Sequence, residues 1–382
     1  RLDSLQLLIN ALMLRSSEWT GRHVSLMTNA VAYFYIYQPR FWKLVRHALP
    51  KMVWTMNPLE LSNIVSAMAR VDRREPQSLL LLARMCRRCA QRNLFAQESL
   101  ATSMNAFAKL DFNHPRLMRA FTEAAVVKMD RALALGRDYR CSSLRDVDVF
   151  DVQALVQLLN TLVCLVGAPD DVILKLLTLV SWSSGELGKY QRRVLKIVIP
   201  CVKSQPQLWA NVPKDVKDAL YVVEHTPTKV HIWQSRWAKE VSFVLKKMDI
   251  IAELKPVVDD QVVDILLPTS NAVIYPVGPY GYYASTTERT AYSKLHQRLL
   301  EMSGHTCMLM PYYEWSELRT EEDKMVYLWS LGRRAAATKD ESGLEADPAV
   351  VNDEELQSDL GQLDDPLDDV AVEHYIKKKA KL

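Results

Sequence analysis

The pair Cys86 and Cys89 has the Cys-x-x-Cys spacing that can bind a metal or carry redox chemistry. A structural zinc site needs four ligands, however, and no second pair follows at the spacing of a zinc ribbon. The residues between the two cysteines are Arg87 and Arg88. We therefore expect two small residues on a helix, with no metal and no cofactor bound there.

Basic residues close to this pair suggest a different chemistry. Arg84, Arg88 and Arg92 follow one another at intervals of four residues, so they lie on one face of a helix. Guanidinium groups in such a row can contact successive phosphates of a nucleic acid. A solvated outer face has the same spacing, so the row alone does not decide between the two. Further basic candidates for RNA contact are Arg87, Arg192, Arg193, Lys294 and Arg298.

The arginines must be positioned by helices, and the first half of the chain repeats itself. Three segments rich in small residues each stand ten residues before a proline, with periods of 37 and then 39 residues: Asn29-Ala30-Val31-Ala32 before Pro39, Ser66-Ala67-Met68-Ala69 before Pro76, and Asn105-Ala106-Phe107-Ala108 before Pro115. Proline is tolerated at the first turn of a helix, so a second helix is expected after each one.

These second helices are predicted over residues 40–53, 77–91 and 116–129, and a weaker fourth unit over 151–180. Helical hairpins that repeat in this way predict an α-solenoid over residues 1–230. An ordinary helical domain with coincidental spacing is the alternative. The pattern resembles the loosely defined repeats of organellar RNA-binding proteins.

The sequence pattern changes from His231 onward, where short apolar runs alternate with helical segments. A helix at 231–245 is followed by short apolar runs typical of strands at 250–254, 262–267, 272–277 and 306–310, with helices expected at 287–302 and 321–331. Strands mixed with helices in this order predict a small α/β domain over residues 231–334.

The residues of this segment resemble the RAP domain, an RNA-binding module. The resemblance rests on the order and spacing of several short motifs: Val262-Val263-Asp264-Ile265, Gly278-Pro279, Lys294 and Arg298 on a helix that closes at Gly304, Met310-Pro311-Tyr312, and Glu314-Trp315. Helical repeats in front of such a domain are the usual arrangement in that family. The resemblance covers about a quarter of the chain.

The resemblance implies a fold similar to restriction-type endonucleases, whose site holds a divalent cation on at least two carboxylates. Asp264 takes the first acidic position. Tyr275 and Val277 stand where the family has acids before Gly-Pro, and Tyr280 or Tyr282 stands where it has a histidine. With one acid left, the resemblance implies that the protein is not an enzyme.

The aromatic residues of this region can instead stack on unpaired bases. Tyr275, Tyr280, Tyr282 and Tyr283 lie around the Gly278-Pro279 turn, which would hold them near the end of a strand. Packing of the same rings inside the domain, or against a protein neighbour, is the alternative.

Composition bounds the remaining possibilities. Residues 335–382 hold thirteen acidic and five basic side chains, so they predict an extended acidic tail with a basic end. The whole chain carries a net charge of +3, which leaves +11 on residues 1–334 and favours a polyanionic partner.

No apolar run is long enough to span a membrane, and six scattered cysteines fit a reducing compartment.

Together these observations predict a non-catalytic RNA-binding subunit of a ribonucleoprotein. The family resemblance implies a mitochondrial one, most concretely a protein of the mitochondrial ribosome that contacts rRNA and neighbouring proteins in the matrix. A free factor that protects or matures organellar transcripts is the alternative. A metal-dependent endoribonuclease and a protein-only scaffold fit the residues less well.

Overall fold

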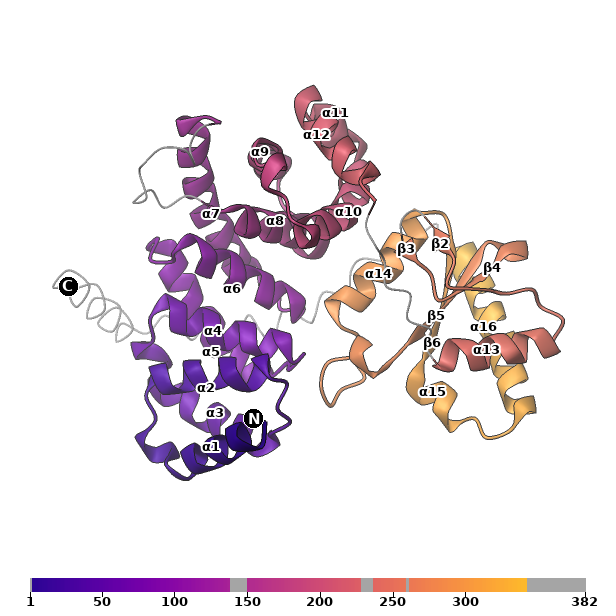
Figure 1. Cartoon of the computed structure of the whole chain (residues 1–382), viewed down its shortest axis with the longest axis horizontal. Helices are drawn as coiled ribbons and strands as arrows, with labels where there is room; N and C mark the ends of the chain where they lie inside the picture. The colour runs from indigo at the N-terminus through magenta and orange to yellow at the C-terminus, as the bar shows by residue number, and fades with distance from the viewer. Residues whose placement is uncertain (1, 138–149, 228–235, 259–260, 342–382) are drawn as a thin grey trace. The chain divides into compact units, whose positions relative to one another are not determined.

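The computed structural model describes residues 2–137, 150–227, 236–258 and 261–341. Within them the chain is mostly helical, with a small four-stranded mixed sheet toward the C-terminus (Figure 1). It divides into two compact units. The first comprises Arg1–Glu224 with Tyr283–Ser285, and the second begins at His225 and holds the sheet.

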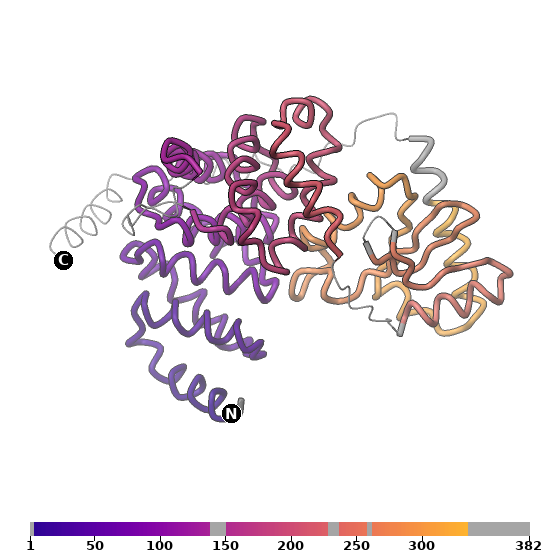
Figure 2. The backbone as a smooth tube through the Cα atoms, turned by 45° about the horizontal axis from the view of Figure 1, so that its top comes forward, coloured from indigo at the N-terminus to yellow at the C-terminus, as the bar shows by residue number. Residues whose placement is uncertain are grey.

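The first unit is built of helical hairpins that follow one another along the chain (Figure 2). Its helices are α1 (Leu2–Leu14), α2 (Gly21–Tyr33), α3 (Pro39–Met52), α4 (Pro58–Arg70), α5 (Pro76–Gln91), α6 (Gln97–Lys109), α7 (Pro115–Leu135), α8 (Val152–Asn160), α9 (Asp170–Trp182), α10 (Lys189–Lys203), α11 (Pro206–Asn211) and α12 (Lys214–His225). A π-helical turn, Thr161–Val166, extends α8.

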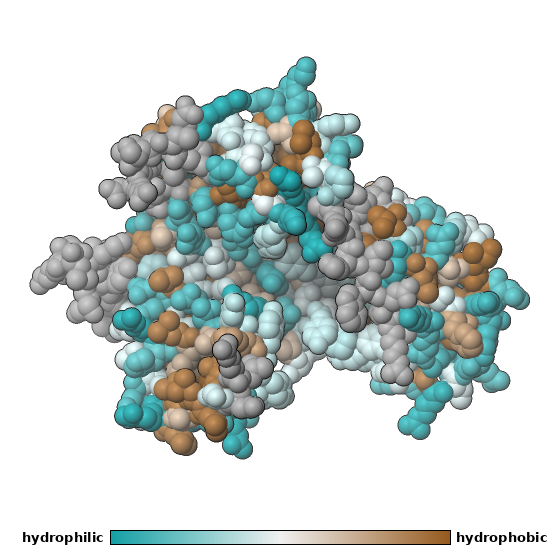
Figure 3. Space-filling model, viewed as in Figure 1, coloured by the Kyte–Doolittle hydropathy of each residue, from teal (hydrophilic) through white to brown (hydrophobic). Residues whose placement is uncertain are grey.

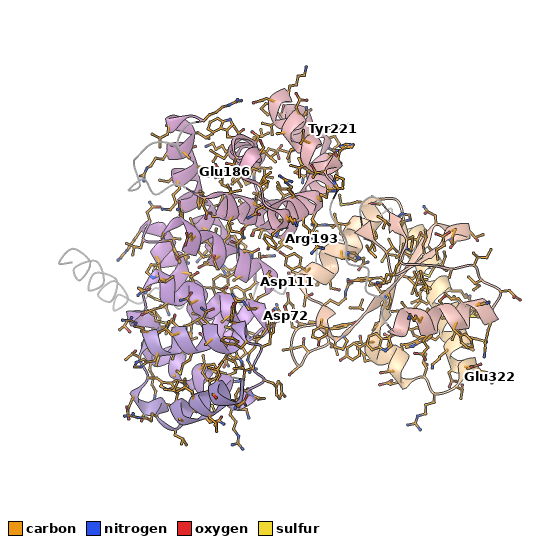
Figure 4. The ribbon with its side chains drawn as sticks, viewed as in Figure 1. Asp72, Asp111, Glu186, Arg193, Tyr221 and Glu322 are labelled. Carbon is orange, nitrogen blue, oxygen red and sulfur yellow. The ribbon has the colours of Figure 1, made fainter. Side chains whose placement is uncertain are left out.

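The predicted starts of the second helices are confirmed, whereas the third of them, α7, continues to Leu135 and not to 129. Each of the three prolines opens the second helix of its hairpin, at α3, α5 and α7. The turn before it is made in the same way each time, with one residue in the left-handed region: Tyr35, Asp72 and Asp111, at φ 50°, 50° and 54°. Figure 4 shows both aspartates at the same edge of this unit.

Small residues let the first helices of successive hairpins pack closely. The helix α2 packs on α4, α4 on α6, and α6 on α8. Asn63 Nδ2 donates to Ser25 Oγ at 3.1 Å across the first of these contacts, and Ser62 Oγ donates to the Ser99 carbonyl at 3.3 Å across the second. Buried rings such as Phe107, which contributes about 2–3 kcal/mol by leaving water, fill the space between the helix layers.

The second unit is a sheet with helices on both faces. Its elements are α13 (Arg236–Lys247), β1 (Glu253–Leu254), β2 (Val257–Val258), β3 (Gln261–Val262), β4 (Ile265–Leu267), β5 (Ala272–Val277), α14 (Ala291–Met302), β6 (Thr306–Pro311), α15 (Tyr312–Glu317) and α16 (Glu321–Glu341). The strand order is β1-β4-β5-β6, with β2 and β3 forming a separate hairpin.

Alternation along the strands sends neighbouring side chains to opposite faces of this sheet. Ile274 of β5 packs with Val241 and Leu328 on the face covered by α13 and α16. Val273 packs with Leu300 of α14 on the other face. The pair β5 and β6 is parallel, and α14 makes the crossover between them, whereas β4 pairs with β5 in antiparallel register.

Several predicted boundaries need correction. The strand expected at 250–254 is only Glu253–Leu254, and α14 begins at Ala291 because Thr290 caps it. The segment around Trp315 forms the helix α15, which periodicity did not reveal because it is so short. The last helix continues ten residues past 331, into the expected tail, through an alanine-rich stretch of high helix propensity.

The rest of the expected tail, from 342 onward, and the start of the helix expected from His231 lie outside the described residues. Among the described helices, none is both long and apolar enough to cross a membrane. The described cysteines are free, and Cys141 lies outside the described residues.

Candidate functional site

The arginine row on α5 does not form one exposed face. Arg84 is only 8% exposed, and its guanidinium lies over the Trp54 ring, 5.1 Å from the ring centroid. Arg88 is half-buried, and Arg92 at the end of the helix is exposed. The apolar face of α5 extends around the helix to Arg84, so the spacing that aligns the three arginines does not expose them equally. Arg84 therefore packs within the repeat, and Arg92 is the exposed member of the row.

The other arginines predicted in the first unit also differ in how exposed they are. Arg87 and Arg192 are half-buried, whereas Arg193 of α10 is exposed; Figure 4 labels it. Cys86 and Cys89 are both buried in α5. Burial raises the pKa of the Cys86 thiol and raises that of Cys89 to about 11, so neither is a ready thiolate.

In the second unit, Asp264 stands directly before β4, next to the end of β5. Ile265 and Ile274 are the last paired residues of β4 and β5. Asp264 and Tyr275 come one residue beyond this pair on their respective chains. The Asp264 carboxylate forms an ion pair with the Lys255 ammonium, and both side chains are largely buried. Lys255 reaches it from a left-handed turn (φ 55°), with its backbone N–H donating to the Asp264 carbonyl at 3.1 Å. A lysine cation thus lies where a metal would have to bind this carboxylate.

Tyr275 faces α14. Its ring lies 4.9 Å from the His296 ring, and its hydroxyl is 3.5 Å from Ser293 Oγ. Burial raises the pKa of Tyr275, so its hydroxyl stays protonated. Burial likewise lowers the pKa of His296 below its ordinary value, so the imidazole is uncharged at neutral pH. A protonated phenol and an imidazole nitrogen are both poorer ligands for a hard cation than carboxylate oxygens are.

Arg289, in the loop before α14, contacts side chains of α14 and the Tyr275 ring. Its Nε donates to Ser293 Oγ at 3.1 Å, its Nη2 to the Ser293 carbonyl at 2.7 Å and its Nη1 to Gln297 Oε1 at 2.5 Å. Its guanidinium lies 6.0 Å from the Tyr275 ring centroid. Sequence reasoning missed Lys255, His296 and Arg289. The spacing of Ser293, His296 and Gln297 on one helix face was the available signal, but nothing marked the lysine.

The predicted aromatic set has members in different settings. Tyr280 is 94% exposed at the Gly278-Pro279 turn, where it is open to a base. Tyr282 is buried, and its ring packs edge-on against Tyr312 and Tyr313, at 5.6 and 5.7 Å. Burial raises its pKa to about 12. Tyr282 therefore builds the domain. Tyr283 belongs to the first compact unit and not to the second.

Two partly exposed aromatic residues that were not predicted, Trp237 and Tyr312, also lie in this unit, and Tyr312 contacts Tyr282. Tyr312 stacks on Trp237 of α13, with 5.9 Å between centroids and 5° between ring planes. Lys294 and Arg298 lie one turn apart on α14 and are exposed. The second unit thus offers an exposed tyrosine, a partly exposed aromatic stack and two surface cations, which are groups that hold single-stranded nucleic acid.

The remaining motif residues have structural roles. Trp315 is 2% exposed and lies in the core between the sheet and α16. Pro279 opens a short 3-10 turn, and Gly278 precedes it in extended conformation. Gly304 ends α14 at φ 83°, which lets the His305 N–H donate to the Leu300 carbonyl at 3.2 Å.

We expect Gly304→Ala to lower the free energy of unfolding by about 1–2 kcal/mol, because a side chain disfavours the left-handed backbone. No atom lies within 4 Å of the added Cβ, so the effect is one of backbone conformation alone. The control is Gly332→Ala in α16, which also meets no atom and should instead raise stability by up to about 1 kcal/mol. Urea unfolding of both variants checks this, and equal effects would contradict it.

Residues 276–331 match the family model of the RAP domain. The match spans the end of β5, the Gly278-Pro279 turn, α14, β6, α15 and the first half of α16. Asp264 and Tyr275 precede it, so their equivalence to family positions stays a prediction. No match was found among curated proteins. Among the residues that the structure describes, no group of three or more histidine, cysteine, aspartate or glutamate side chains is placed to hold a metal ion.

Proposed function

Because residues 276–331 form a RAP domain, an RNA-binding domain, we propose that the chain binds RNA through both units and does not cleave it. The match to this domain is the observation that carries the proposal. The excess of positive charge over residues 1–334 supports it, since cations that contact phosphates supply much of the affinity for RNA.

The ion pair between Asp264 and Lys255 supports the absence of cleavage. Metal-assisted hydrolysis needs carboxylates that hold a divalent cation and a water molecule. Here the carboxylate before β4 is already paired with Lys255, and the residue of β5 one position beyond the last register pair is Tyr275, which carries no carboxylate. Incubation of labelled RNA with Mg²⁺ tests this point. Cleavage by the purified protein that is lost in Asp264→Ala would contradict the proposal.

Exposed cations of the first unit are expected to contribute to RNA affinity through phosphate contacts. Arg92→Ala and Arg193→Ala should each weaken binding and reduce the slope of log Kd against log salt by about 0.7, because one fewer counterion is released from single-stranded RNA. Fluorescence anisotropy over a salt series measures the slope. Arg15→Ala, which removes an exposed arginine paired with Glu18, is the control. A slope that is unchanged in both variants would place the RNA elsewhere.

We further propose that the protein is a structural subunit of a mitochondrial ribonucleoprotein, most concretely a mitochondrial ribosomal protein that contacts rRNA. The support is the combination of helical repeats with a RAP domain, which resembles organellar RNA-binding proteins, together with the pairing of Asp264 with Lys255. Gradient sedimentation of the tagged protein from organelle lysate tests this. Migration with a ribosomal subunit supports it. Light, ribonuclease-sensitive particles would favour a free transcript-binding factor, and ribonuclease-insensitive particles a protein scaffold.

A further inference from the structure

The turn between α2 and α3 carries an unusual surface. Four aromatic residues in five positions are exposed: Tyr33 by 65%, Phe34 by 49%, Tyr35 by 71% and Tyr37 by 88%. The one aliphatic residue among them, Ile36, is buried and anchors the turn to the core. We call these five residues the aromatic turn. Rings this exposed contribute little to folding, and such clusters are typical of binding sites.

The fold does not require aromatic residues at this place. The equivalent left-handed position in the next two hairpins is Asp72 and Asp111, where Tyr35 stands here. Aspartate adopts this conformation more readily than a bulky residue. Because the same turn forms without rings in the neighbouring hairpins, packing does not explain the aromatic turn.

The arrangement of the rings suits flat ligands. Tyr33 and Phe34 meet edge to face, with centroids 5.1 Å apart. Tyr35 and Tyr37 lie on either side of the buried Ile36 and both project from the surface. The three tyrosines are exposed, so their hydroxyls can also reach a ligand.

A fixed cation adjoins these rings. The guanidinium of Arg70, from the next hairpin, lies 5.8 Å from the Tyr33 ring centroid, and its Nη1 donates to Asn29 Oδ1 at 3.3 Å. Basic residues outnumber acidic ones by ten to five over residues 1–75. Rings beside a held arginine match the two parts of a nucleotide, since the base stacks on the ring and the phosphate meets the guanidinium.

We propose that the aromatic turn is a stacking site for unpaired bases of single-stranded RNA, with Arg70 contacting the backbone. This inference rests on the proposed RNA binding and assigns it a site in the first hairpin. A protein partner fits less well. The exposed aliphatic side chains of the kind that proteins bind, Leu7, Leu8 and Leu14, lie on α1 and not in the turn; Figure 3 shows apolar surface over the first helices.

The test uses the full chain and a single-stranded RNA of about 12 nucleotides containing 2-aminopurine, whose fluorescence is quenched on stacking. Replacing the two most exposed rings by Tyr35→Leu and Tyr37→Leu together should raise the Kd by about 30-fold and abolish the quench, since one stacked ring contributes at least about fivefold. The pair Tyr35→Phe and Tyr37→Phe keeps both rings and should stay within about threefold of the parent protein. Leu135→Ala, which alters a side chain that is 40% exposed at the end of α7, is the control and should change nothing.

A second measurement does not depend on variants. RNA with 4-thiouridine, cross-linked to the parent protein and digested with trypsin, should yield the labelled peptide of residues 23–40, which lies between cleavages at Arg22 and Arg40 and contains all four rings. RNA binding that is equal in the parent and the leucine pair, with cross-links elsewhere, would overturn this inference and leave the proposed function standing. Absence of RNA binding by the parent protein would overturn both. A loss of binding in the phenylalanine pair equal to that in the leucine pair would exclude stacking.

Discussion

Trp315→Ala is expected to lower the free energy of unfolding of the RAP-containing unit by about 3–5 kcal/mol, which is a large fraction of the stability of a domain. The indole is 2% exposed, packs edge-on against Tyr327 with 6.0 Å between centroids, and has the Lys324 ammonium 5.6 Å from its centroid. Truncation would leave a cavity between the sheet and α16 and would remove this cation–π contact. Urea unfolding followed by circular dichroism measures the loss.

Trp329→Ala is the matched control for this experiment. Trp329 lies on the same unit but is 61% exposed on α16. Its truncation removes the same number of atoms without opening a cavity, so stability should change by less than about 0.5 kcal/mol. A comparable loss in both variants would mean that Trp315 does not fill the core as described. RNA binding by the Trp315 variant should fall together with its folded fraction.

Breaking the ion pair between Lys255 and Asp264 is expected to destabilise the same unit by about 3 kcal/mol. Lys255→Met leaves the Asp264 carboxylate largely buried without its cation, and Asp264→Leu leaves the ammonium without its anion. The double variant Lys255→Met/Asp264→Leu removes both charges and should recover most of the loss, because apolar side chains of similar size can replace a buried ion pair at little cost. Urea unfolding of the three variants completes a double-mutant cycle.

The cycle also separates a structural pair from a vacant metal site. A structural pair makes the single variants unstable whether or not Mg²⁺ is present. If Asp264 instead served as a metal ligand, Lys255→Met would free it, and millimolar Mg²⁺ would stabilise that variant selectively. Selective stabilisation by Mg²⁺, or a loss in the double variant equal to the sum of the single losses, would contradict the structural role.

The helical hairpins were predictable because their signals are local. Small residues on a helix face and a proline at the first position of the next helix act within one or two turns, and Pro39, Pro76 and Pro115 all open helices as expected. The RAP motifs were predictable for the same reason, since Gly304 and the Gly278-Pro279 turn specify backbone conformations within a few residues.

Which of the candidate side chains are exposed was decided only by the tertiary structure. Spacing along α5 placed Arg84 with Arg92, but Trp54 of the preceding hairpin covers Arg84. Likewise, Tyr282 and Tyr280 are two residues apart, yet Tyr312 and Tyr313 bury the first and leave the second exposed. Burial depends on neighbours that are distant in the sequence, so periodicity on one element cannot report it. The pairing of Asp264 with Lys255 has the same origin, because strand register and a left-handed turn bring the two side chains together, and no local pattern specifies either one.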